Sequence, residues 1–310
     1  MITRPSVLVL GAGASMDFGF PSGWGLYQRV IYSLSNGPDV ARAMHDMGVT
    51  PSDCAVLLTA LQRSGAKSVD AFLAYRRELV EVGKAAIAAA LIPCENALVV
   101  LNDSIMEPGR APAASWLRWL FERMKARDAE EWRRNQLSIV TFNYDRVVEF
   151  FLHSALVHNF SLTEVEAWAL LSNTVKIVHV HGLLGEFPGG RPNVGRPFEP
   201  NLGPATLRMA ASGVLIAHEG SEDDEQFTAA RSLLDNAERV MFMGFGFNPD
   251  NISRLRLEST LRGKTVRSSC IGMVQTELAV VQDLVPETGF GFDPSCASLT
   301  DLIRHHAILT

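Results

Sequence analysis

Two glycines and a serine that could bind phosphate follow the first apolar run of the chain. Residues 7–10 read as a buried strand, which leads directly into the turn at residues 11–15, with glycines at 11 and 13. Glycines there let backbone amides approach a diphosphate, and the start of a following helix adds its positive dipole end. Met16 stands where the dehydrogenase fingerprint has its third glycine, which argues against hydride transfer. The alternative is a purely structural tight turn.

A second glycine turn follows a late apolar run. Residues 240–243 are followed by Gly244 and Gly246, and then by Asn248 and Pro249. Asparagine before proline predicts a helix N-cap with proline at the first helical position. Two glycine turns after different strands of one sheet could flank a single crevice and hold the two ends of a dinucleotide.

Polar side chains also follow the apolar run at residues 137–141. Asn143 and Asp145 lie where open α/β sheets bind ligands, at the carboxyl end of a parallel strand. The alternative is that one of them only caps the next helix.

A further apolar run, at residues 175–180, includes His179 and is followed by His181 and Gly182. Strand alternation would put the two histidines on one face. His181, at the strand end, could act as a base or hydrogen-bond donor near neutral pH, although a lone histidine is more often structural.

Residues 18–25 are too rich in glycine and proline for a regular element, yet they carry three aromatic side chains. This segment could fold over a bound ligand as a flap. A plain connection with Trp24 buried in the core is the alternative.

The apolar runs alternate with segments of helical period, which predicts a doubly wound α/β fold with a largely parallel sheet. The expected strands are residues 7–10, 137–141, 175–180, 214–217, 240–243 and 266–273. More than 100 residues of helical pattern separate the first two, so residues 25–135 are expected to form a helical insertion lobe. Residues 1–24 and 136–310 then form a Rossmann-like domain, and residues 185–203, with five glycines and four prolines, form a loop.

Composition excludes several classes of protein. With 310 residues, 47% of them hydrophobic, the chain can bury a sizeable core, and its net charge of −6 argues against a dedicated nucleic-acid binder. A basic stretch at residues 254–267 is expected to be a solvated helix face rather than a DNA contact. No Cys-x-x-Cys pair is present among Cys54, Cys94, Cys270 and Cys296, so no zinc ribbon or disulfide framework is indicated. We expect a cytoplasmic protein with no membrane span, and the signal-peptide-like start is better explained as a strand and turn.

Taken together, the four segments resemble the sirtuin family: Gly-Ala-Gly-x-Ser at residues 11–15, Thr-x-Asn-x-Asp at 141–145, His-Gly at 181–182, and a late glycine turn before a helix. Residues 183–238 lack the four zinc-binding cysteines of sirtuin deacylases, and Ser22-Gly23-Trp24 replaces their Asp-Phe-Arg. With Asn-Tyr-Asp at residues 143–145 and Gly-Phe-Gly-Phe-Asn at 244–248, the chain is similar to the zinc-free, sirtuin-like NAD hydrolases of prokaryotic antiphage defence.

This resemblance implies a Rossmann-like domain that binds NAD⁺ as substrate, with no metal, and assigns roles to individual residues. His181 would accept a proton, Asn143 would hold the ribose or the attacking water, and Asp145 would anchor the nicotinamide carboxamide. The remaining residues expected to bind the dinucleotide are Gly11, Ala12, Gly13, Ser15, Pro21, Gly244, Gly246 and Asn248.

The expected activity is NAD⁺ glycohydrolysis to nicotinamide and ADP-ribose, which would deplete NAD in antiviral defence. The alternatives are a sirtuin-type protein deacylase or ADP-ribosyltransferase, and a non-catalytic NAD-binding subunit. Because such a hydrolase would be toxic when unrestrained, we expect a homo-oligomer or a complex with a partner defence protein, without direct nucleic-acid or membrane contact.

Overall fold

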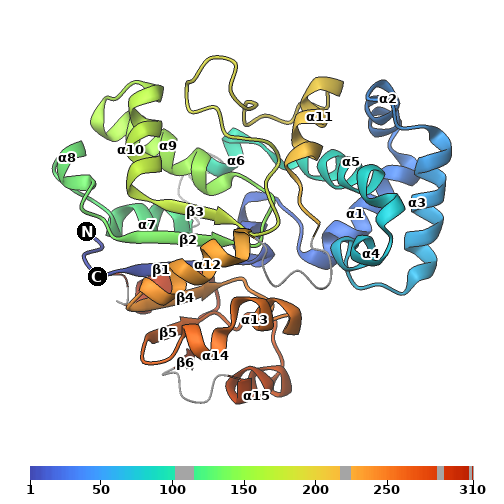
Figure 1. Cartoon of the computed structure of the whole chain (residues 1–310). Coiled ribbons are helices and arrows are strands. Elements are labelled where there is room, and N and C mark those ends of the chain that lie inside the picture. Colours follow the sequence, from blue (N-terminus) through green and yellow to red (C-terminus); the bar gives the residue numbers. More distant parts are fainter. Residues whose placement is uncertain (102–114, 217–224, 285–289, 307–308, 310) are drawn as a thin grey trace, which may run out of the picture.

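The computed structural model describes residues 1–101, 115–216, 225–284, 290–306 and 309. Within them, six parallel strands form one sheet in the order β3-β2-β1-β4-β5-β6 (Figure 1). The strands are β1 (Ser6–Leu10), β2 (Leu137–Thr141), β3 (Lys176–His179), β4 (Arg239–Met243), β5 (Thr265–Ser268) and β6 (Phe290–Phe292). This is the strand order of the Rossmann fold, which confirms the predicted parallel α/β sheet. The order reverses between β1 and β4, and that is where such sheets bind ligands.

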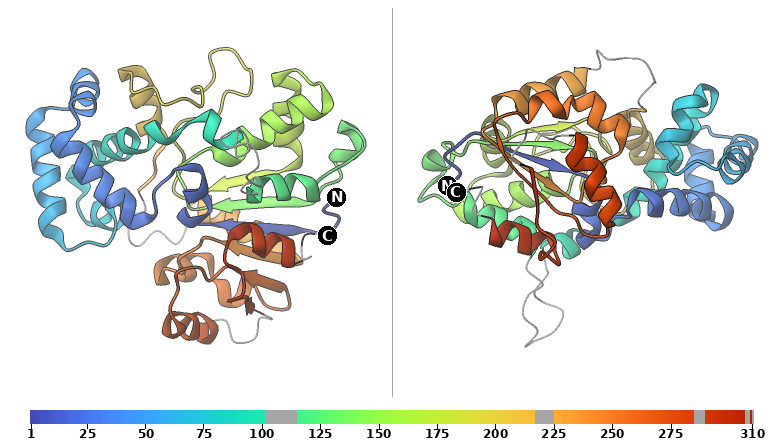
Figure 2. Two further views of the ribbon diagram at one scale, coloured as in Figure 1. Left: turned by 180° about the vertical axis from the view of Figure 1, so that it is seen from behind. Right: turned by 90° about the horizontal axis from the view of Figure 1, so that it is seen from below.

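Each face of the sheet has its own apolar core. Leu8 and Leu10 of β1 belong to one core, and Val7 and Val9 belong to the other, as the two-residue period of a strand requires. Because helices cover both faces, all of β1 is buried, which explains its unbroken apolar run (Figure 2). The first core includes residues of α7 (Trp116–Arg123), α9 (Val147–Phe160), α10 (Glu164–Thr174) and α16 (Leu299–His305); the second includes residues of α12 (Glu225–Asn236), α13 (Pro249–Leu255), α14 (Leu257–Thr260) and α15 (Gln275–Leu284).

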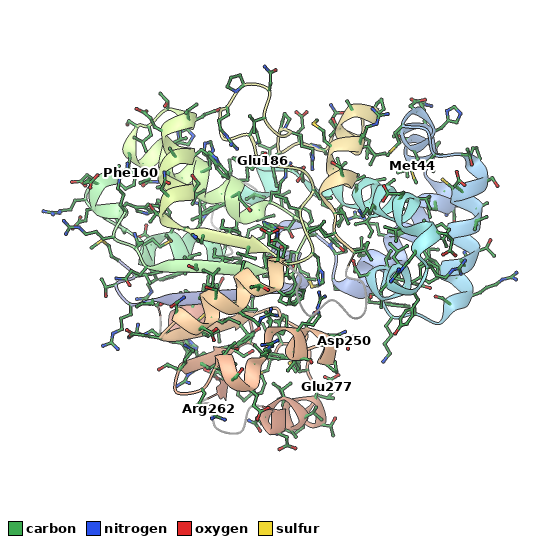
Figure 3. The ribbon with its side chains drawn as sticks, in the orientation of Figure 1. Met44, Phe160, Glu186, Asp250, Arg262 and Glu277 are labelled. Atoms are coloured by element: carbon green, nitrogen blue, oxygen red, sulfur yellow. The ribbon has the colours of Figure 1, made fainter. Side chains whose placement is uncertain are left out.

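A group of helices stands beside the sheet rather than on it (Figure 1). It contains α1 (Gly23–Asn36), α2 (Pro38–Asp46), α3 (Pro51–Ser64), α4 (Val69–Tyr75), α5 (Val80–Leu91) and, from later in the chain, α11 (Pro204–Gly213). Helix α5 is central, and its alanine-rich residues 85–90 are buried because all the other helices of the group pack against it. Met44 of α2 lies in this group, far across the view from Phe160 at the end of α9 (Figure 3). None of the described helices has the length and apolarity needed to cross a membrane.

The predicted insertion lobe contains more than this group. Helices α6 (Ala97–Leu101) and α7 contact α9 rather than the side group, and the Trp116 indole Nε1 of α7 donates to Ala14 O over 2.8 Å. The short helix α8 (Ala129–Trp132) follows α7, and its Trp132 is buried in the first core. Residues 25–135 are thus shared between the side group and the helical layer on the sheet. The division into two domains stays a prediction.

Two strand predictions are wrong. Val214 follows α11 and makes only an isolated antiparallel bridge with Gly182, so no strand begins there; Ala217 lies outside the described residues. Strand β5 ends at Ser268 rather than at residue 273, because a turn follows. Strand β3 was predicted to within one residue at each end. The sixth strand, β6, was not predicted because it has only three residues with glycine in the middle.

A buried ion cluster fastens the glycine- and proline-rich loop at residues 185–203. The carboxylate of Glu95 accepts from Arg146 Nε and Nη2, at 3.0 and 2.9 Å, and also from Arg196 Nη2. All three side chains have no exposed surface. Arg146 Nη1 also donates to Arg196 O, and Arg196 Nε to Leu184 O, both over 2.7 Å. One carboxylate therefore joins the loop, the end of the helical group and the segment between β2 and α9.

Candidate functional site

The two glycine turns cross at the switch point between β1 and β4. Gly11 N donates to Met243 O over 3.0 Å, and Gly13 N donates to Gly244 O over 3.1 Å. A Cβ at Gly11 would lie 2.5 Å from Gly244 O, and one at Gly244, where φ is +58°, would lie 2.2 Å from Ala14 N. These glycines are therefore required by backbone packing. The amides of Gly11 and Gly13, expected to face a diphosphate, are used within the protein.

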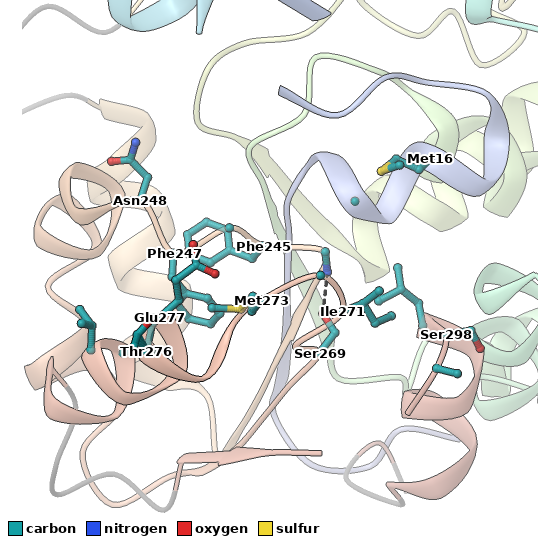
Figure 4. Close-up of a pocket in the computed structure, with 18 of the residues that line it drawn as sticks. Met16, Phe245, Phe247, Asn248, Ser269, Ile271, Met273, Thr276, Glu277 and Ser298 are labelled. Carbon is teal, nitrogen blue, oxygen red and sulfur yellow. Dashed lines mark hydrogen bonds between the residues drawn. The ribbon is translucent and has the colours of Figure 1, made fainter. Parts of the chain in front are cut away.

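A cavity of about 870 Å³ opens on one side of this crossing, at the ends of β4 and β5. Its walls carry Met16, Ile271 and Ser298 across from Phe247 and Glu277 (Figure 4). Of the residues predicted to bind a dinucleotide, Gly13, Gly244, Gly246 and Asn248 line this cavity. Asn248 is also the N-cap of α13 with proline at the first helical position, which confirms that prediction.

A smaller cavity of about 90 Å³ lies on the other side, at the ends of β1 and β2. It is lined by the predicted site residues Ala12, Ser15, Pro21, Asn143 and Asp145. The two cavities are neighbours, because the ring of Phe142 in the small one lies 4.9 Å, centroid to centroid, from that of Phe245 in the large one. Gly11 and His181 line neither cavity.

Asn143, Ser15 and Asp145 form one hydrogen-bonded chain. The Asn143 amide nitrogen Nδ2 donates to Gly11 O and to Ser15 Oγ, each over 3.0 Å. The Ser15 hydroxyl hydrogen-bonds to the Asp145 carboxylate. Because both amide hydrogens of Asn143 are engaged, its carbonyl oxygen Oδ1 is the group that can accept a bond from a ligand. Asn143 does not cap α9; Asp145 Oδ1 does accept from Val147 N, at 3.2 Å, so the capping alternative holds in part for that residue.

Asp145 is poised to titrate near neutral pH. Burial raises the pKa of its carboxyl to about 6, and the hydrogen bonds from Ser15 and Val147 oppose this only in part. A buried carboxylate of raised pKa at the edge of a cavity is typical of a functional site.

His179, rather than His181, is the histidine buried at the end of β3. Its Nδ1 lies 2.9 Å from Asn143 O, and its Nε2 lies 2.6 Å from Oε1 of Glu149. Burial favours the neutral imidazole, but the Glu149 carboxylate and the two hydrogen bonds outweigh burial and raise the pKa of His179. In its doubly protonated form, which the raised pKa favours, His179 donates to both partners and holds the main chain of Asn143 in place.

We expect His179→Ala to destabilise the fold by about 3–5 kcal/mol, because Glu149 would remain buried without its cation. Since the folded pKa of His179 is raised, its contribution is fully present below the unfolded value of about 6.5 and is lost as pH rises through the folded value. Urea unfolding at about pH 6 and about pH 9 measures both effects, with the exposed His45→Ala as control. A variant as stable as the wild type at the lower pH would refute the ion pair.

His181 does not share a face with His179, so that expectation is wrong. The strand ends at His179, and the turn before Gly182, where φ is +73°, directs His181 toward the opposite core. Its ring lies 5.5 Å from that of Phe142 and 6.0 Å from that of Phe227 on α12. His181 therefore adjoins the small cavity through Phe142.

The segment at residues 18–25 is part of the small cavity. Pro21, Ser22 and Gly23 line it, and Ser22 caps α1 by accepting from Gly25 N over 3.1 Å. Trp24 is 55% exposed and stacks on Tyr27, so the alternative with Trp24 in the core is wrong.

Several site residues were missed from the sequence. Ser269 Oγ accepts from Gly244 N over 2.9 Å and lines the large cavity, but it was hidden in a strand predicted to run to residue 273. Tyr144, in the small cavity, donates its hydroxyl to Asp70 of α4. The sequence did contain a signal for Glu149, because it is an acidic residue among the apolar positions of α9.

No protein-family model and no curated protein matches the chain. Among solved structures it is similar to a mutant Sir2 homologue in complex with 2′-O-acetyl ADP ribose. The two share 14% sequence identity over 97% of this chain and 90% of the other, with a TM-score of 0.42. The order and parallel pairing of the six strands define the Rossmann-like fold of the described residues.

Proposed function

We propose that the chain is an NAD⁺ glycohydrolase that cleaves the bond between nicotinamide and ribose. The observation that carries the proposal is the pair of neighbouring cavities on either side of the glycine crossing, the smaller with a buried carboxylate and a fixed amide at its wall. A dinucleotide laid across the crossing would put its adenosine half in the large cavity and its nicotinamide in the small one. The Ala12 N–H, at the start of the 3₁₀ helix Ala12–Phe18, has no intrahelical acceptor and is suited to a phosphate oxygen.

The chemistry needs charge stabilisation more than acid catalysis. Nicotinamide departs as a neutral base from a cationic pyridinium, so no group has to protonate it. A buried site disfavours the pyridinium relative to the neutral leaving group, provided that the carboxamide is held, and ionised Asp145 can accept its N–H. Asn143 Oδ1 would hold a ribose hydroxyl or the attacking water while the sugar carbon becomes cationic. His181 would take the proton that the water loses when its oxygen bonds to that carbon, and for this its ring would have to reach past Phe142, which separates it from the small cavity.

The decisive experiment incubates purified protein with NAD⁺, with and without an acylated peptide, and follows nicotinamide by chromatography. Release without peptide is expected. Release only with peptide would instead indicate a deacylase or transferase. Tight NAD⁺ binding without cleavage, unchanged in His181→Ala, would indicate a non-catalytic subunit. In cells, expression should lower the NAD level, which is the effect that the proposed antiviral role requires. Because such depletion would be toxic, the proposal also includes a partner or an oligomer that restrains the activity.

The rate of nicotinamide release should fall with acidity. With the pKa of Asp145 at about 6, the carboxylate is ionised at pH 7 and becomes protonated below pH 6, where it can no longer accept the carboxamide N–H as an anion. We expect kcat/KM to decline about tenfold per pH unit below that value. Asp145→Asn should be slow at every pH and should lose the part of this decline that belongs to Asp145. The part that remains would be assigned to another group, such as the proposed base His181.

Gly246→Ala should separate binding from folding. Apart from its two chain neighbours, a Cβ at Gly246 would meet no described protein atom within 4 Å, so stability should change by less than about 0.5 kcal/mol. If the dinucleotide passes over Gly246, the added methyl should weaken NAD⁺ binding by about 1–3 kcal/mol, measured by calorimetry. Gly244→Ala is the contrasting variant, because its clash with Ala14 N must lower the melting temperature itself. Unchanged affinity for NAD⁺ in Gly246→Ala would show that the dinucleotide does not pass over this turn.

A further inference from the structure

Three unlike donor groups meet near the end of the described chain. Asp293, Cys296 and His306 each offer one ligand atom, and the carboxylate oxygen, thiol sulfur and imidazole nitrogen all lie within 4.8 Å of one another. Asp293 Oδ2 is 2.8 Å from His306 Nε2, and Cys296 is buried. This cluster follows β6 and lies outside both sets of cavity-lining residues described above.

We propose that Asp293, Cys296 and His306 bind one Zn²⁺ ion. A thiolate, an imidazole and a carboxylate are the three ligand types that zinc takes in proteins, and a hard cation such as Mg²⁺ or Ca²⁺ would not select the sulfur. The fourth tetrahedral position falls to water or to His305, whose Nδ1 lies 3.8 Å from Cys296 Sγ. With Zn–S near 2.3 Å and Zn–N near 2.0–2.1 Å, ligand atoms of one tetrahedron are about 3.5 Å apart. The pairs that involve Cys296 would therefore close by about 1 Å at most, and zinc would replace the hydrogen bond between Asp293 Oδ2 and His306 Nε2, which would move slightly apart from 2.8 Å.

The carboxylate is already oriented for this role. Asp293 Oδ1 accepts from Ser295 N over 2.9 Å and from the Ser295 hydroxyl, which leaves Oδ2 directed at His306. Such hydrogen bonds to a ligand's second oxygen fix its position and are a usual part of protein zinc sites.

The ion would close a loop that contributes to the large cavity. Cys296 and His306 flank α16, and residues 297–299 between them line the cavity. Helix α16 packs on α7, where the guanidinium of Arg304 lies 5.1 Å from the ring of Trp119. Zinc would thus brace one wall of the large cavity, whatever ligand that cavity takes. The site departs from the expectation of a chain without metal, because no Cys-x-x-Cys pair marks it in the sequence.

The test uses the full chain, dialysed against buffer with added Zn²⁺ and then without it, and measures bound zinc by elemental mass spectrometry. We expect about one zinc per chain and, with Co²⁺ in its place, the absorption bands of a thiolate-bound tetrahedral cobalt ion. Cys296→Ser and His306→Ala should each weaken zinc binding at least about 100-fold and remove or shift those bands. Cys54→Ser, in α3, is the control that should change neither.

A second readout guards against a variant that folds poorly. Added Zn²⁺ should raise the melting temperature of the wild type and of Cys54→Ser, and should not do so for His306→Ala, whose side chain is partly exposed and which should still fold. Absence of zinc from the wild type together with no thiolate band would overturn the proposal and leave Asp293 and His306 as a hydrogen-bonded pair. Full zinc retention by either ligand variant would overturn it as well. Neither result depends on NAD⁺ turnover.

Discussion

Asn143→Ala should slow nicotinamide release by about 100- to 1,000-fold. The truncation removes the Oδ1 acceptor proposed to hold the ribose or water, and it also frees Ser15 Oγ and Gly11 O from the amide that joins them. The effect should fall mainly on kcat, since the acceptor matters most as positive charge develops on the sugar. Steady-state rates with NAD⁺ measure it.

The matched control for this variant is Asn173→Ala, an exposed amide on α10 that donates to Ala169 O of its own helix. It should leave the rate unchanged. Circular dichroism and the melting temperature must show that Asn143→Ala is folded. A folded Asn143→Ala protein that releases nicotinamide at the wild-type rate would remove Asn143 from the mechanism and, with it, the role proposed for the small cavity.

Glu95→Gln should destabilise the protein by at least about 3–5 kcal/mol. The Glu95 carboxylate is the anion between the guanidinium groups of Arg146 and Arg196, and all three side chains have no exposed surface. Burial and the neighbouring charge of Arg146 already lower the pKa of Arg196 to about 10, although Glu95 opposes this. Replacing the carboxylate by an amide of the same shape leaves two buried cations without an anion.

Urea unfolding of Glu95→Gln beside Glu186→Gln tests this directly. Glu186 pairs with Arg191 at 3.0 Å, but its side chain is 60% exposed, so its loss should cost less than about 1 kcal/mol. Equal stabilities for the two variants would show that the buried cluster contributes little to the stability of the fold.

The central part of the sheet was predictable because burial on both faces leaves a distinct pattern. Strands β1, β2 and β4 were placed to within one residue, since each is a short apolar run that leads into glycine or polar residues. The run at residues 214–217 has the same composition, yet Val214 follows directly on α11, and only one bridge forms there. Composition alone cannot distinguish a strand from a buried connection.

The site residues that lie at strand ends were predictable from the sequence. The pairs that form between segments far apart in the sequence were not. Asn143, Ser15 and Asp145 belong together because β1 and β2 are parallel neighbours whose carboxyl ends meet. The partnership of Glu95 with Arg146, or of Tyr144 with Asp70, joins segments more than 50 residues apart through contacts for which no local pattern exists. The direction of His181 was missed because the strand period was extended through a turn.

The small cavity is built by two parts of the chain with different constraints. Its sheet side consists of strand ends fixed by the parallel ladder, whereas its other side consists of residues from α1, α4 and α5: Gly23, Leu26, Asp70 and Leu91. Substitutions in those helices can change the shape of the small cavity without disturbing strand pairing or the glycine crossing. Under the proposed function, the preference for one leaving group over another could therefore diverge among homologous chains while the residues at the strand ends are retained.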